Sequence, residues 1–131
     1  MTDAAYHPLY LQGIEQFNAA EFFRCHETWE ELWMAQTGAP RRYYQGLIQA
    51  AVALHHLGRG NVRGARKLMA RSRRYLDPFR PEYLGLDVDR FLAEMTECVC
   101  RTPDNAAMGL EEPARRTVAP PTIRLRSARA G

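Results

Sequence analysis

Apolar residues recur at spacings of three and four along the first hundred residues, which is the periodicity of amphipathic α-helices. In the first such stretch Tyr10, Ile14 and Phe17 fall on one face. Asn18 follows, and we expect it to end this helix and to cap the next one. The full pattern predicts helices over residues 6–17, 19–36, 40–58, 62–76 and 88–100. It indicates an all-α fold, an antiparallel bundle of about five helices built from αα-hairpins.

The stretch 40–58 is apolar nearly all round, which is typical of a helix at the centre of a bundle. Gly46 within it leaves room for the close approach of a neighbouring helix. The polar side chains of this stretch are few and therefore informative. They recur at spacings of three, four and seven, which places them on one face of the helix: Arg42, Gln45, Gln49 and His56.

Residues 101–131 differ from the rest of the chain, with four prolines, no aromatic residue and no sustained periodicity. Such a composition buries too little apolar surface to order itself. We therefore expect a helical domain over 1–100 and an irregular, Pro- and Arg-containing tail over 101–131 that is disordered or weakly docked. The tail also holds the entire net charge of +3, because residues 1–100 carry twelve basic and twelve acidic side chains.

The remaining composition favours a single globular domain in a reducing compartment. The 131 residues are 46% hydrophobic and 25% charged, which is ordinary for a globular protein. Neither a secretory signal nor a run long enough to span a bilayer is recognisable, so we expect no membrane association. The three cysteines, Cys25, Cys98 and Cys100, are an odd number and favour free thiols. We expect a cytoplasmic protein.

The segment that stands out chemically is His26-x-x-x-Glu30-x-x-Trp33. It lies within the predicted helix 19–36, and its spacing of four and then three places an imidazole, a carboxylate and an indole on one face. This is the one segment in which ionisable residues interrupt an apolar stripe. A helix that only had to pack would not need the imidazole and the carboxylate.

His26 and Glu30 are candidate metal ligands, because side chains four residues apart on a helix can bind one ion. His56 is the best candidate for a third ligand, and Gln49 is a weaker one. Two histidines and a carboxylate suit Zn²⁺, Fe²⁺ or Mn²⁺ and leave positions open for water, which favours a hydrolase-like site. Glu30 and Glu27 are then the candidate catalytic residues, with Glu27 as a base. The pattern is not His-Glu-x-x-His, so no metalloprotease is indicated.

Two interpretations of these residues remain open. In the first, Arg42, Gln45, Gln49 and Trp33 line a binding site around the metal ligands. In the second, the polar side chains satisfy one another in a buried hydrogen-bond network between two helices, in a non-catalytic structural or protein-interaction module. Whether the protein is an enzyme is undecided at this stage.

The ordered set of motifs also resembles a known family. His26-x-x-x-Glu30-x-x-Trp33, a basic residue at 41 or 42, Gly-Leu-Ile-Gln at 46–49, His56 and Gly60-Asn61-x-x-Gly64-Ala65 together are similar to the signature of domain-of-unknown-function family 309. The resemblance covers roughly residues 8–76. It implies a small all-helical domain and a suspected metal-binding role for the His/Glu motif, and it carries no activity.

The sequence gives weaker indications of partners. A homo-oligomer through the surface of the helical hairpins fits the pattern. The basic face of 62–76 and the arginines of the tail raise nucleic acid as a partner. We disfavour nucleic acid, because acidic residues elsewhere balance the helical charges and the tail offers no aromatic side chain for stacking.

Overall fold

The computed structural model describes residues 6–101 and 119–126, and over these residues the protein is a bundle of five α-helices. They are α1 (Pro8–Asn18), α2 (Phe22–Met34), α3 (Gly38–Gly58), α4 (Val62–Leu76) and α5 (Val88–Cys100). Between α4 and α5 lie a short 3₁₀ helix, η2 (Asp77–Phe79), and two antiparallel strands, β1 (Glu82–Tyr83) and β2 (Leu86–Asp87). The prediction of an all-α bundle is confirmed, and the small hairpin is an addition to it.

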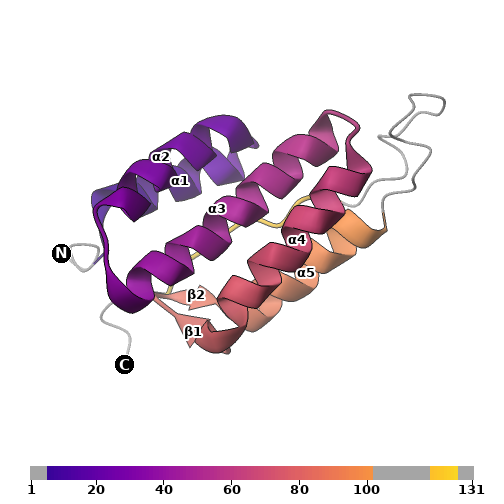
Figure 1. Cartoon of the computed structure of the whole chain (residues 1–131). Helices are drawn as coiled ribbons and strands as arrows, with labels where there is room; N and C mark the ends of the chain where they lie inside the picture. Colours follow the sequence, from indigo (N-terminus) through magenta and orange to yellow (C-terminus); the bar gives the residue numbers. More distant parts are fainter. Residues whose placement is uncertain (1–5, 102–118, 127–131) are drawn as a thin grey trace.

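The helix α3 lies at the centre of the bundle, with the pair α1–α2 on one side and the pair α4–α5 on the other (Figure 1). Its side chains are buried on nearly every face: Tyr43, Tyr44, Gly46, Leu47, Ile48, Ala50, Ala51, Ala53 and Leu54. The expectation from its apolar sequence is therefore confirmed. None of the helices within 6–101 has the length and apolarity needed to cross a membrane.

The two later helices begin at the residues that the sequence indicates, because side chains cap them. The Asn61 Oδ1 accepts a hydrogen bond of 2.9 Å from the Gly64 amide, at the start of α4. The Asp87 Oδ1 accepts one of 3.0 Å from the Arg90 amide, at the start of α5. Each bond satisfies a backbone donor that the helix itself leaves unpaired.

The helices α3 and α4 are joined by a close contact at Gly46. The buried Ser72 hydroxyl of α4 donates a 2.8 Å hydrogen bond to the Gly46 carbonyl oxygen. A Cβ atom at Gly46 would lie 2.6 Å from Cγ and Cδ2 of the buried Leu76 and 3.0 Å from Cβ of Tyr75. The absence of a side chain at Gly46 therefore sets how closely the two helices approach.

Residues 119–126 of the tail pack against the helical domain and run behind α3 in the view of Figure 1. Ile123 is buried, and its backbone forms two hydrogen bonds with the Asn18 amide group, of 2.7 and 2.9 Å. The predicted cap role of Asn18 is therefore wrong. The residue does end α1, but Glu21 precedes α2 after a turn in which Ala20 is left-handed, with φ of 62°. The expectations for 102–118 and 127–131 lie outside the described residues.

The contact at Gly46 predicts that Gly46→Ala lowers the free energy of unfolding by about 1–3 kcal/mol, because the added methyl group displaces Leu76. Urea denaturation of the two proteins measures this difference. Gly58→Ala is the matched control on the same helix, since nothing lies within 4 Å of a Cβ atom there. The control should be neutral or stabilising by up to about 1 kcal/mol. Equal effects of the two substitutions would contradict the packing argument.

The tail contact predicts that Asn18→Ala loosens residues 119–126, because it removes both side-chain bonds to the Ile123 backbone. Hydrogen exchange of the Ile123 amide should become at least about tenfold faster, the effect of losing interactions of ~1.4 kcal/mol. Gln12→Ala, an exposed change on the same helix, is the control and should leave exchange unaltered. Unchanged exchange in Asn18→Ala would show that Ile123 alone anchors the segment.

Candidate functional site

A pocket of about 280 Å³ lies where α2, α3 and α4 meet, and we call it the seam pocket. The three helices contribute different side chains to its wall. Those from α2 are His26, Glu30 and Trp33, those from α3 are Gln45, Ile48, Gln49 and Val52, and those from α4 are Leu68 and Arg71. The structure thus brings five of the sequence-predicted site residues into one pocket: His26, Glu30, Trp33, Gln45 and Gln49.

His26 and Glu30 form the charged edge of the seam pocket. The His26 Nε2 lies 3.8 Å from the Glu30 Oε1, as their spacing of four residues on α2 requires. The imidazole is mostly buried and 22% exposed, whereas the carboxylate is 51% exposed. The pair therefore faces solvent on the Glu30 side and the interior on the His26 side.

Two buried polar atoms of the seam pocket residues have no hydrogen-bond partner among the described residues. They are the Nδ1 of His26 and the Oε1 of Gln49. A buried polar atom left unpaired costs about 1–3 kcal/mol. A network selected only to fix the register of the helices would be expected to satisfy both atoms. The Gln16 Oε1 on α1 is likewise buried without a partner among the described residues, and Gln16 does not line the seam pocket. What distinguishes His26 and Gln49 is that their side chains line one pocket, where another molecule could supply the missing bonds.

His56 and Glu27 do not line the seam pocket. The residue His56 is seven positions beyond Gln49, a rise of about 10 Å along the helix. It lies in the last turn of α3, where its Nδ1 is 3.5 Å from the Asn61 Nδ2. Glu27 is exposed, because the next residue on a helix points about 100° away from His26. The helical spacing correctly places His56 on the same face of α3 as Gln49, but His56 lies too far along the helix to reach the seam pocket.

Trp33 closes one end of the seam pocket and is itself covered by a cation. The Arg41 guanidinium carbon lies 4.0 Å from the centroid of the Trp33 ring. This distance is within the range of a cation–π interaction, which is worth about 0.5–1 kcal/mol at an exposed site. Trp33 is half-buried, so it serves as packing and as a wall of the pocket at once.

Arg42 lines a neighbouring pocket of about 450 Å³, which we call the arginine pocket. Its other lining residues all come from α4 and are Arg71, Arg74 and Tyr75. Arg71 lines both pockets, so the two sites share one side chain. Sequence reasoning missed Arg71 because the basic face of α4 looks like an ordinary solvated face. The signal was present in its spacing, since 71, 74 and 75 share one side of a helix.

A second feature that the sequence did not reveal is an aromatic contact beside His26. The ring of Phe23 lies 5.4 Å from that of His26 and 5.3 Å from that of His55, and Phe23 is 53% exposed. Partial burial lowers the pKa of His55, and the nearby cation Arg59 and the two neighbouring histidines lower it further. His55 is therefore disposed toward its neutral form at this edge of the site.

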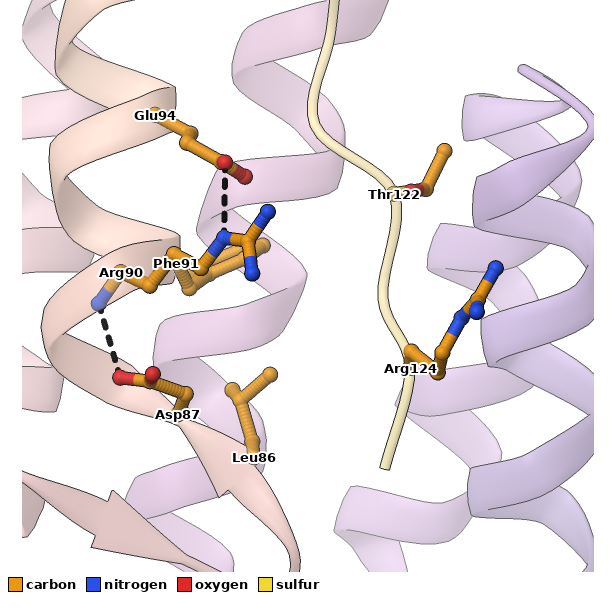
Figure 2. Close-up of a pocket in the computed structure, with 7 residues that line it drawn as sticks. All are labelled: Leu86, Asp87, Arg90, Phe91, Glu94, Thr122 and Arg124. Atoms are coloured by element: carbon orange, nitrogen blue, oxygen red, sulfur yellow. Dashed lines mark hydrogen bonds and ion pairs between the residues drawn. The ribbon is translucent and has the colours of Figure 1, made fainter. Parts of the chain in front are cut away.

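A third pocket, of about 360 Å³, lies between α5 and the tail segment (Figure 2). The Arg90 Nε donates a 2.9 Å bond to Glu94, and the Arg90 amide donates to the Asp87 side chain. Figure 2 shows Arg124 on the opposite wall, extending away from this pair. The charges of this pocket are already compensated within the protein. The seam pocket, with its unpaired atoms, is therefore the stronger candidate site.

The donor set of the seam pocket fits a metal ion only in part. Among residues 6–101 and 119–126, no three His, Cys, Asp or Glu side chains are grouped so that they could hold an ion. Two of the three predicted ligands, His26 and Glu30, do meet. Their separation of 3.8 Å is close to the ~3.3 Å between tetrahedral ligands with metal bonds of about 2.0–2.1 Å. The Gln49 Oε1 is the remaining oxygen of the pocket that lacks a partner.

The fold and the seam pocket define a small all-α protein with a polar site between its second, third and fourth helices. Residues 10–68 match the family model described as "Domain of unknown function (DUF309)". The match contains all the seam pocket residues except Arg71. The resemblance recognised from the sequence motifs is thereby confirmed.

Two curated proteins are similar to this chain. The "Uncharacterized protein YpuF" of Bacillus subtilis (strain 168) is 43% identical over 94 residues, which are 69% of this chain and 54% of YpuF. An "Uncharacterized protein" of Aquifex aeolicus (strain VF5) is 41% identical over 46 residues, which are 34% of this chain and 14% of that protein. The chain thus spans about half the length of YpuF and a smaller part of the Aquifex protein.

Proposed function

We propose that the seam pocket is a binding site for a divalent metal ion, with His26 and Glu30 as its principal ligands. The observation that carries this proposal is the pair of buried, unpartnered atoms, His26 Nδ1 and Gln49 Oε1, in side chains that line one pocket. The Gln49 Oε1 gains a partner from a bound ion or its water. An ion held by Glu30 and the nearby His26 Nε2 leaves the His26 Nδ1 unpartnered, so Nδ1 gains a partner only if the ring turns to present it to the ion. Zn²⁺, Fe²⁺ and Mn²⁺ are the ions that an imidazole and a carboxylate suit.

The pocket leaves room for more than the ion. Two protein ligands and a weak third leave coordination positions open, and a metal ion with open positions supplies a water nucleophile at neutral pH. Gln45 and Trp33 lie on the same wall, where they can orient a substrate. The proposal is therefore a hydrolase-like site, and it includes a cytoplasmic location, supported by three free thiols, Cys25, Cys98 and Cys100.

The second candidate function is a non-catalytic module in which the same side chains set the register of α2 against α3. The mostly buried imidazole of His26, which lines one pocket with Gln45 and Gln49 of α3, favours it. Against it stand the exposure of Glu30 and the unpaired Gln49 oxygen, since a register-setting network is worth most when closed and fully satisfied. The two functions differ in what substitutions of His26 and Gln49 should do.

Metal binding is tested by titrating Zn²⁺ and Mn²⁺ into the full chain, purified without an affinity tag, in a calorimeter. His26→Ala and Glu30→Gln should each weaken binding by more than about tenfold, because each removes a ligand. His56→Ala is the matched control and should bind as the unaltered chain does, since His56 lies in the last turn of α3 and does not line the seam pocket. Undiminished binding by His26→Ala would rule out this site.

Gln49→Leu separates the binding site from the structural network. Leucine has a similar volume and removes the buried oxygen that lacks a partner, so the metal-free protein should be unchanged or more stable by about 1 kcal/mol. Metal affinity should fall in the same variant. Gln45→Leu is the control, because no buried atom of Gln45 lacks a partner. A loss of stability in Gln49→Leu, measured by urea denaturation, would favour the register-setting network instead.

A further inference from the structure

The helix α4 concentrates positive charge to an unusual degree. It carries six basic side chains and no acidic one: Arg63, Arg66, Lys67, Arg71, Arg73 and Arg74. Arg73 is engaged, since its guanidinium donates a 2.9 Å hydrogen bond to the Thr96 hydroxyl. Neither Arg71 nor Arg74 lies within 4.0 Å of a carboxylate oxygen of the described residues. The same is true of Arg42 on α3.

Other exposed arginines of the protein fall into two groups. The first also has no carboxylate oxygen within 4.0 Å among the described residues: Arg24, Arg59, Arg63 and Arg124. Carboxylate oxygens lie between 2.6 and 3.1 Å from the second group: Arg80, Arg90, Arg101 and Arg126. Charge pairing is therefore the rule around η2, β1 and α5. Arg42, Arg71 and Arg74 differ from the other unpaired arginines because all three line one pocket, without a counter-ion from the described residues.

The packing of the bundle holds these three cations together. Gly46 and Ser72 bind each other at the contact of α3 and α4. Arg42 lies four residues before Gly46, whereas Arg71 and Arg74 lie one residue before and two residues after Ser72. The contact therefore brings the three positions to one concavity of about 450 Å³. Like charges gathered in a concave surface raise the local concentration of anions. Bringing them together is unfavourable unless an anion compensates them.

The chemistry of the pocket selects a phosphate group among anions. A guanidinium presents a planar fork of donors that matches phosphate oxygens in pairs. Three such cations exceed the single charge of a carboxylate and the charge of about −2 on a phosphate monoester, and they come closest to balancing a diphosphate. Tyr75 adds a phenol to the wall. Arg71 lines the seam pocket as well, so the arginine pocket shares this residue with the site of His26 and Glu30.

We infer that the arginine pocket binds the phosphate group of a small phosphorylated substrate, with Arg42 and Arg74 as its specific contacts and Arg71 as the link to the seam pocket. The inference names the substrate class of the seam pocket, and in that respect it rests on the proposed function. Phosphate binding itself does not, because Arg42 and Arg74 lie outside the seam pocket. The two can therefore fail separately.

The experiment titrates inorganic pyrophosphate into the full, metal-free chain in a calorimeter. Arg42→Gln and Arg74→Gln should each weaken binding by about tenfold, the usual effect of losing one charge-assisted contact. Arg63→Gln is the matched control, an exposed cation of α4 that does not line the pocket. It should change binding by less than about twofold, the size of a screened surface effect. All three substitutions are at exposed positions, and equal melting temperatures without ligand confirm that the variants fold.

Two further measurements decide the remaining outcomes. His26→Ala should keep its affinity for pyrophosphate, which separates this site from the metal site. A twelve-nucleotide single-stranded RNA is titrated in parallel. Absence of pyrophosphate binding at millimolar concentration overturns the inference. The second result that overturns it is binding of RNA without binding of pyrophosphate. If Arg63→Gln then weakens RNA binding as much as Arg74→Gln does, α4 is an extended surface for a polyanion.

Discussion

The contact between Gly46 of α3 and Ser72 of α4 is the constraint on which the rest of the structure depends. The Ser72 hydroxyl donates a 2.8 Å hydrogen bond to the Gly46 carbonyl oxygen, and a Cβ atom at Gly46 would collide with Leu76 beside it. This contact fixes the register of two helices along their length. On one side of it Gln49 meets Leu68 and Arg71 in the seam pocket, and on the other Arg42 meets Arg74 in the arginine pocket. Both sites that we propose thus depend on how α3 packs against α4 at Gly46.

The fold was predictable because its local and global signals agree. The apolar surface of residues 40–58 requires burial on every side, and α3 is accordingly central. Asn61 and Asp87 each mark a helix start by a cap that depends on neighbouring backbone alone. Asn18 looked like such a cap, but its amide binds Ile123, more than a hundred residues away. A periodicity argument has no access to that partner, so it predicted neither the path of 119–126 nor the pocket beneath it.

The candidate site was predictable within one helix and less so between helices. The spacing of His26, Glu30 and Trp33 fixes their shared face, and the structure keeps them together. On α3 the helical spacing indicates which residues share a face, but not how far along that face the neighbouring helices cover it. It therefore grouped His56 with Gln45 and Gln49, although His56 does not line the seam pocket. Arg71 belongs to a third helix, whose register depends on the contact at Gly46. Only the packing of α3 against α4 could bring that cation to the edge of the imidazole.

The distribution of charge connects the two pockets. Residues 1–100 are neutral as a whole, yet α4 holds six cations without an acid, and most acids lie on α2 and on the η2–α5 side. Folding pairs the arginines near α5 with carboxylates but leaves Arg42, Arg71 and Arg74 facing one another. In the two sites that we propose, Glu30 in the seam pocket and the cations of the arginine pocket would bind opposite partners, a metal ion and an anion. Each partner would reduce the electrostatic cost of the other, which is why neither pocket is as favourable alone as the two are together.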